Sequence, residues 1–122
     1  MKFSVLLLLL LLVLVACESG PGDPAVAVEE YLQAKVASDI DEIRANLCAE
    51  MESVLERESR TFESVSGVEL VGMSCQQDGD QPVVRCEGAI TALYGTEETE
   101  FPLVSYRVVE EDGQWKWCGE AP

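Results

Sequence analysis

The chain has 122 residues and a formal net charge of −15, from 23 acidic and 8 basic residues with no histidine. This length predicts one domain, and the charge argues against nucleic acid as a partner and against docking on anionic lipid. The absence of histidine and of any Cys-x-x-Cys pair argues against zinc. We expect neither a metal nor another cofactor.

The first 16 residues predict a signal peptide. Lys2 gives a positive start, and the apolar run from Phe3 to Ala16 is interrupted only by Ser4. Such a run is too short for a membrane-spanning helix, which needs about 20 residues. It has the form of the apolar core of a secretory signal, which is removed from the mature protein.

The residues at the end of this run, Leu14-Val15-Ala16-Cys17, resemble the lipobox of bacterial lipoproteins. The resemblance implies a diacylglyceryl group on the Cys17 thiol and cleavage before this residue. Each buried methylene contributes about 0.8 kcal/mol, so two or more acyl chains anchor a protein firmly. We expect export and lipid anchoring to the bacterial cell membrane or outer membrane, with residues 17–23 as a tether and the domain on the extracytoplasmic side.

Two or three helices are predicted after the tether. The first begins at Asp23-Pro24, a capping acid before a proline, and ends near Ser38-Asp39, where the pattern loosens. A third helical pattern is expected to end at Gly67. The apolar positions with helical spacing are Val28, Tyr31, Leu32, Val36, Ile40, Ile43, Leu47, Cys48, Met51, Val54, Leu55 and Phe62.

Beyond Gly67 the apolar pattern changes to that of strands. Turn-forming residues at 76–82, 95–97 and 111–113 separate the segments, and Asp112-Gly113 is a strong hairpin signal. Pro102 lies near the start of the third segment, where proline is tolerated. The four predicted strands are 68–75, 83–94, 101–109 and 115–118. Helices followed by an antiparallel meander predict an α+β domain over residues 24–122.

The four remaining cysteines predict two disulfides, with three possible connectivities. Cys75 and Cys86 flank the first turn almost symmetrically, so a hairpin would place them opposite each other and leave Cys48 for Cys118. One difficulty is that strict alternation puts Cys118 on the opposite face from Trp117. This pairing therefore requires the last strand to end or to bulge there.

Two segments carry a resemblance to the nuclear-transport-factor-2-like superfamily, and more narrowly to its small exported lipoproteins. They are "AVAVEEYLQAKVASDIDEIRANLC" and "EEDGQWKWC". The resemblance implies helices packed on a curved, about four-stranded sheet, with a cone-like pocket between them and a buried tryptophan at Trp115. In exported members a cysteine of an early helix is bonded to one just past this tryptophan. A plain cystatin-like helix-on-sheet fold is the near alternative.

The residues that we select as pocket candidates are Tyr31, Tyr94, Tyr106 and Trp117. Each is also an ordinary core or rim residue, because aromatic side chains commonly fill cores. Isomerase-like relatives use a pocket base and a tyrosine, and here the base would be a carboxylate such as Asp39 or Asp41. We expect no catalytic residue, because no spacing in the sequence defines a reacting geometry. The Asp78–Asp80 segment suggests a turn rather than a calcium loop.

These observations predict a membrane-anchored lipoprotein that acts as a non-enzymatic ligand-binding or protein-partner module of the cell envelope. Its expected partners are the membrane, through the lipid on Cys17, and a small ligand or an envelope protein. The alternatives are a small enzyme of isomerase type that uses a pocket carboxylate and a tyrosine, and an inhibitory or structural envelope protein.

Overall fold

The computed structural model describes residues 20–122. The predicted signal peptide and Cys17 lie outside the described residues. Within residues 20–122, no helix is both long enough and apolar enough to cross a membrane.

The helices begin and end where local signals are strongest. Asp23 caps the first helix by accepting a hydrogen bond from the Ala25 amide at 2.9 Å, and Pro24 occupies the first helical position. Ser38, with a φ of 54°, turns the chain between the first and second helices, and Asp39 caps the second helix. The elements are α1 (Pro24–Val36), α2 (Ile40–Asn46), the 3-10 helix η1 (Ala49–Val54) and α3 (Leu55–Arg60).

Five antiparallel strands form one sheet, which confirms the α+β class and corrects the expected number of about four strands. They are β1 (Ser66–Gln77), β2 (Val83–Tyr94), β3 (Glu97–Pro102), β4 (Ser105–Glu111) and β5 (Gln114–Glu120). The order is β1-β2-β4-β5, and β3 also pairs with β2. The long strand β2 therefore pairs with β4 along its first part and with β3 along its second part.

The predicted strand 101–109 is divided at Leu103-Val104. Pro102 is the last residue of β3 rather than an early residue of a longer strand, because proline lacks the amide that a continuing ladder needs. Two backbone hydrogen bonds still hold the connection against β2, from Leu103 N–H to Gly88 O and from Cys86 N–H to Val104 O. The division is thus a bend in the segment that runs beside β2.

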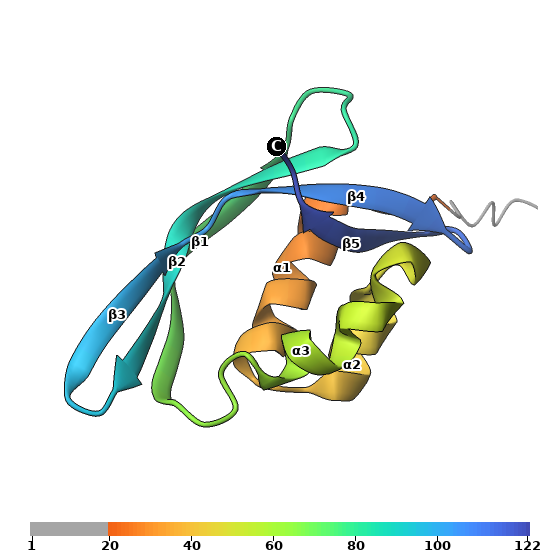
Figure 1. Cartoon of the computed structure of the whole chain (residues 1–122). Helices are drawn as coiled ribbons and strands as arrows, with labels where there is room; N and C mark the ends of the chain where they lie inside the picture. The colour runs from red at the N-terminus through yellow and green to blue at the C-terminus, as the bar shows by residue number, and fades with distance from the viewer. Residues whose placement is uncertain (1–19) are drawn as a thin grey trace, which may run out of the picture.

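A line of bends crosses the sheet and gives it its curvature. The β1–β2 register shifts between Val71 and Ser74, and the facing Gly88 has a φ of 100°. On the other side of β2, the Leu103 amide donates to Gly88 O, so the bend between β3 and β4 lies next to the bend at Gly88. Bulges and glycine kinks bend strands in this way. Figure 1 shows the helices together on one side of the curved sheet.

Two sequence predictions in the helical region are wrong. The third helix ends at Arg60, and Gly67 lies within β1 with a φ of 58° at an irregularity of the register. Gly67 therefore bends a strand instead of ending a helix. Ile40 is 38% exposed, because it is the first residue of α2 and lies outside the buried face that Ile43 enters.

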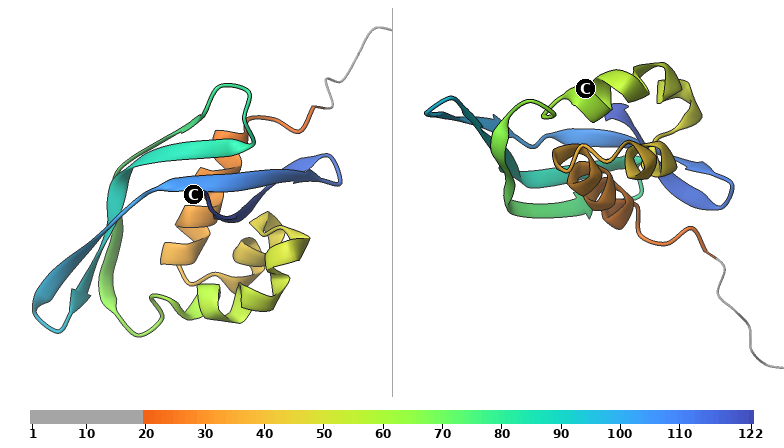
Figure 2. Two further views of the ribbon diagram at one scale, coloured as in Figure 1. Left: turned by 45° about the horizontal axis from the view of Figure 1, so that its top comes forward. Right: turned by 90° about the horizontal axis from the view of Figure 1, so that it is seen from below.

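The core lies between α1 and the sheet. Val28 and Leu32 of α1 are almost fully buried, as are Val84 of β2 and Val108 of β4. A hydrogen bond also links α1 to the edge strand β1, because the Glu29 carboxylate of α1 accepts from the Cys75 amide of β1 at 3.3 Å. Figure 2 shows α1 packed along the sheet and the shorter helices beside it.

The disulfide pairs are those expected from the sequence. Cys75 and Cys86 are directly opposite each other in the β1–β2 ladder and are bonded. Cys48, just after α2, is bonded to Cys118 of β5. The Cys48 amide also donates a hydrogen bond to Trp117 O at 2.9 Å. This bond and the sulfur bridge hold the helical layer to the last strand.

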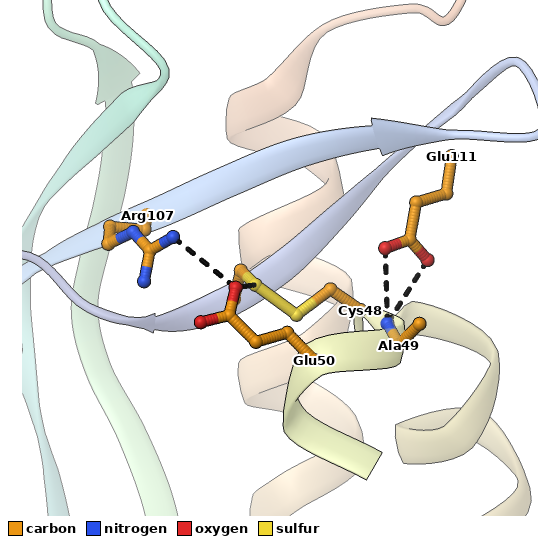
Figure 3. The surroundings of a disulfide bond; sticks show 6 residues. Cys48, Ala49, Glu50, Arg107 and Glu111 are labelled. Carbon is orange, nitrogen blue, oxygen red and sulfur yellow. Dashed lines mark hydrogen bonds and ion pairs between the residues drawn. A yellow bond between two sulfur atoms is a disulfide. The ribbon is translucent and has the colours of Figure 1, made fainter.

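Polar contacts surround the Cys48–Cys118 bond, as Figure 3 shows. The Glu50 carboxylate lies 3.7 Å from Cys118 Sγ and 3.5 Å from the Arg107 guanidinium. The Glu111 carboxylate accepts from the Ala49 amide with both oxygens at 3.1 Å. The start of η1 is therefore attached to β4 and β5 by side chains as well as by the disulfide.

A bulge in β5 explains how Trp117 and Cys118 are both buried. Val108 pairs with Trp117, but Tyr106 pairs with Glu120, so β5 has one residue more than β4 between these pairs. Gly119 has a φ of 95° at this point, a conformation that glycine adopts without strain. Strict alternation is broken there, and the difficulty with the predicted cysteine pairing disappears.

Candidate functional site

A cavity of about 360 Å³ lies between the helices and the sheet, and all four pocket candidates line it. Tyr31 comes from α1, Tyr94 from β2, Tyr106 from β4 and Trp117 from β5. They meet because α1 crosses the concave face of the sheet. The volume is within the range of pockets that hold small molecules.

The inner part of the cavity has an aromatic floor, which consists of Tyr31, Trp117 and Tyr106. The rings of Tyr31 and Trp117 stack with centroids 3.9 Å apart and an interplanar angle of 7°. Tyr106 packs at an angle against Trp117, at a centroid distance of 6.5 Å. All three side chains are buried. The floor is thus a rigid aromatic surface that joins α1 to β4 and β5.

The outer part has an aromatic mouth, which consists of Phe62, Phe101 and Tyr94. Phe101 meets Phe62 edge-on at 5.9 Å and Tyr94 edge-on at 6.3 Å. Tyr94 is 45% exposed and Phe101 38% exposed, whereas Phe62 is buried. The cavity therefore passes from exposed aromatic rings at the mouth to buried ones at the floor.

An ion pair forms part of the cavity wall. Lys35 Nζ of α1 lies 2.7 Å from Glu58 Oε2 of α3. Glu58 is only 7% exposed, and a buried carboxylate is costly unless it is paired. Arg57 and Glu120 also line the cavity. Its charged wall thus holds two basic and two acidic groups.

Burial raises the pKa of the Tyr31 hydroxyl well above its ordinary value, and the neighbouring Glu58 carboxylate adds to the increase. Burial also raises the pKa of Tyr106, whose hydroxyl accepts a hydrogen bond from the Val104 amide at 3.3 Å. Both phenols of the floor therefore stay protonated at neutral pH. They can act as hydrogen-bond donors and not as bases.

The carboxylates considered as a pocket base, Asp39 and Asp41, do not line the cavity. Asp39 caps α2 by accepting from the Glu42 amide at 3.2 Å. Asp41 forms an exposed ion pair with Arg44 at 3.0 Å. Both residues lie at the start of a short helix, where acidic side chains stabilise the free amides.

The carboxylate that does reach the cavity is Glu58, which was not among the predicted site residues. A signal for it exists, because Glu58 lies four residues after Val54 and four before Phe62. These positions share one face of a helix, so a charged residue occurs on an apolar face. Its partner Lys35 lies 23 positions earlier in the chain.

The expected burial of Trp115 is wrong. The resemblance implied a buried Trp115, but Trp117 is the one that is 3% exposed and packs in the core, and Trp115 is only partly buried. Trp115 lies beside Pro21 and Gly22 in a shallow surface hollow. The two residues are two positions apart on one face of β5, and Trp115 is the one nearer the β4–β5 turn, at the edge of the core.

Residues 20–122 contain no group of three or more cysteine or acidic side chains arranged to hold a metal ion. The Asp78–Asp80 segment forms the turn between β1 and β2, closed by the Asp78 amide donating to Val83 O at 2.8 Å. The Asp112-Gly113 turn joins β4 to β5, with φ values of 53° and 76°. This is the positive-φ hairpin turn that the dipeptide predicts.

Neither a family model nor a curated protein sequence matches this chain significantly. The solved structures that are similar to this chain include two at 17% sequence identity each. One is a SEC-C motif containing protein from Rhodopseudomonas palustris, with a TM-score of 0.62 over 84% of this chain and 81% of that one. The other is an NTF2-like protein of unknown function in nutrient uptake from Rhodospirillum rubrum, with a TM-score of 0.52 over 80% of this chain and 95% of that one. The likeness shows the fold alone, which is an α+β fold similar to that of both proteins.

Proposed function

We propose that the protein is a non-enzymatic ligand-binding module of the bacterial cell envelope, anchored to a membrane by a lipid on Cys17. The observation that carries the binding role is the cavity of about 360 Å³ with its aromatic floor. A few polar groups in a mostly apolar wall are typical of small-molecule sites. The motif at residues 14–17 supports the anchor.

Fluorescence titration with N-phenyl-1-naphthylamine tests the binding role, because this neutral dye becomes brighter in an apolar site. We expect saturable binding to the folded protein. Thr61 is exposed and lines the cavity, so Thr61→Trp should obstruct it and weaken binding at least tenfold. Thr96→Trp, in the exposed turn after β2, is the matched control and should bind normally. Equal binding by both variants would contradict the assignment of the cavity.

Mass spectrometry of the protein extracted from its own membranes tests the anchor. The expected product begins at Cys17 and carries the added mass of a diacylglyceryl group. Cys17→Ser should remain unprocessed and lose the lipid. A mature protein that begins elsewhere, without lipid, would refute the anchor and leave the binding role unaffected.

The isomerase alternative has one observation in its favour, the buried Glu58 beside the Tyr31 hydroxyl. A base in such a site must accept a proton from a substrate. The ammonium of Lys35 already neutralises this carboxylate at 2.7 Å. The pairing favours a structural role for Glu58, and binding without turnover is therefore the stronger proposal.

The alternative of an inhibitory or structural partner protein would be favoured by a flat apolar sheet face. The exposed residues along β1 and β3 include the carboxylates Glu69, Glu98 and Glu100 around Val71. Clustered charge is depleted at the centre of protein interfaces. This surface does not favour an apolar partner.

A further inference from the structure

The strand β3 has a free edge. It pairs with β2 along one side, and no other strand formed by residues 20–122 pairs with it. Figure 2 shows the end of the β2–β3 hairpin extending beyond the helices. An edge strand presents backbone amides and carbonyls to which a further strand can add. The free edge of β3 therefore offers hydrogen-bonding groups to a partner.

The backbone groups that face this edge belong to Glu98 and Glu100. In an antiparallel ladder, alternate residues bond to the neighbouring strand and the residues between them face the other way. The Leu103 amide donates to Gly88 O of β2. Two positions earlier, Phe101 therefore also bonds to β2, whereas Glu98 and Glu100 face outward. Outside the ladders of residues 20–122, no backbone hydrogen bond uses either glutamate.

The side chains of these two residues lie on an acidic face of the sheet. They line a shallow hollow of about 500 Å³ together with Glu69 of β1. All three carboxylates are exposed, and the ion pairs of residues 20–122 involve other acidic side chains. Within the same part of the chain, no basic side chain lines the hollow. A cationic side chain on a strand beside β3 would balance this charge.

The other face of β3 is partly apolar. Phe101 is 38% exposed and packs edge-on against Tyr94 and Phe62 at the mouth of the cavity. A strand added to β3 would also alternate its side chains between the two faces. Residues that alternate with its cationic ones would therefore lie on the side of Phe101.

A second copy of this chain does not suit the edge. If two β3 strands paired, glutamates of both copies would come together on one face, and like charges in such positions are destabilising. Charged side chains on edge strands prevent this kind of self-pairing. The edge thus disfavours another copy of an acidic chain and favours a basic segment.

We propose that the free edge of β3 binds an extended segment of another protein in which two lysine or arginine residues are separated by one apolar residue. The segment adds antiparallel, as the strands of this sheet do, and its basic residues pair with Glu98 and Glu100. In strand addition, main-chain hydrogen bonds provide affinity and alternate side chains provide specificity. The inference goes beyond the proposed function, because it concerns a protein partner at the sheet edge and not a small molecule in the cavity.

Isothermal titration calorimetry with three acetylated and amidated peptides tests the proposal. GVKVRVG has the expected pattern, GKVVRVG has the same composition with its basic residues on opposite faces of a strand, and GVEVEVG is acidic. We expect GVKVRVG to bind at least threefold more tightly than GKVVRVG, and GVEVEVG not to bind.

Charge-neutralising variants test the assigned residues. Glu98→Gln combined with Glu100→Gln should weaken binding of GVKVRVG about fivefold. Glu30→Gln combined with Glu110→Gln is the matched control, because both residues are exposed, belong to no ion pair of residues 20–122 and give the same change in net charge. This control should keep its affinity.

Methylation of peptide amides tests strand addition without altering the protein. In the proposed pairing, the lysine and arginine amides of GVKVRVG donate to β3, and the amide of the valine between them faces away. Methylating the first two amides should abolish binding, whereas methylating the valine amide should leave it unchanged. Hydrogen exchange of the amides of residues 98 and 100 should slow in the complex.

Three outcomes would overturn the proposal. If none of the peptides binds, the edge has no such partner, and the small-molecule site is unaffected. If GVKVRVG and GKVVRVG bind equally, or if both double variants lose the same affinity, the attraction is to the overall charge and not to this edge. If either methylation weakens binding equally, the segment does not add as a strand.

Discussion

At the scale of single residues, Glu58 is the most unusual side chain, because it is a buried carboxylate in a strongly acidic protein. Its 7% exposure is tolerated because the Lys35 ammonium lies 2.7 Å away. Removing one partner of a buried pair leaves an uncompensated charge, which costs more than the pair contributes. The pair is therefore a point where one substitution should have a large effect.

We expect Lys35→Met to lower the free energy of unfolding at pH 7 by about 2 kcal/mol, since Glu58 loses its partner. The exposed pair of Arg44 and Asp41 provides the control, and Arg44→Met should cost no more than about 0.5 kcal/mol. Urea unfolding at pH 7 measures these differences, and equal losses for the two variants would contradict the buried role of Lys35.

At the scale of elements, the line of bends across β1, β2 and β3 gives the sheet the curvature in which the helices lie. At its centre, a Cβ added to Gly88 would lie 2.6 Å from Gly72 O, and the φ of 100° is one that other residues rarely adopt. Both the conformation and the contact therefore require glycine.

Gly88→Ala should destabilise the protein by about 3 kcal/mol, because backbone strain adds to a contact that the neighbouring backbone cannot relieve. Gly79 is a suitable comparison, since it also has a positive φ, of 58°, but has open space around it. Gly79→Ala should cost about 1 kcal/mol. Denaturant midpoints measure both, and similar costs would show that the contact with Gly72 is unimportant.

The two disulfides differ in the length of chain that they close. Cys48–Cys118 spans 70 positions and Cys75–Cys86 spans 11. Loop-closure entropy predicts a loss of about 4 kcal/mol when the first pair is replaced by alanine and about 3 kcal/mol for the second. Only the first replacement should speed hydrogen exchange of the residue 48 amide, which bonds to Trp117 O. The opposite order of stabilities would contradict the entropic account.

At the scale of the whole molecule, 23 acidic residues against 8 basic ones produce a self-repulsion that opposes folding. The described ion pairs other than Lys35–Glu58 are largely exposed and contribute little. Stability therefore depends on the core and on the two disulfides. The same net charge keeps the molecule soluble.

Sodium chloride should stabilise the protein, because it screens this repulsion. Between about 0.01 and 0.15 M salt the screening length falls from about 30 to about 8 Å. We expect the free energy of unfolding at pH 7 to rise by about 1 kcal/mol over this range. Near pH 4 the gain should shrink, since many carboxylates are then protonated. A stability that falls with salt at pH 7 would show that attractive charge pairs dominate.

The sequence predicted the features that depend on neighbouring residues. Asp23-Pro24 starts a helix, Asp112-Gly113 makes a hairpin turn, and symmetry about the first turn pairs Cys75 with Cys86. The four pocket candidates all line one cavity between the helices and the sheet.

Features that depend on distant segments were not predicted. The burial of both Trp117 and Cys118 depends on an irregular register with β4. The ion pair in the cavity wall depends on the approach of α1 to α3. The division between β3 and β4 depends on a bend that three strands share. None of these is visible in the spacing of apolar residues.

The bulge at Gly119 also has a consequence for how the protein can change during evolution. Deleting this one residue would restore regular pairing between the last two strands. The indole of Trp117 and the sulfur of Cys118 would then face opposite sides, and either the crosslink or the stacked ring would be lost. The final strand therefore cannot lose this residue without losing one of its two buried contacts.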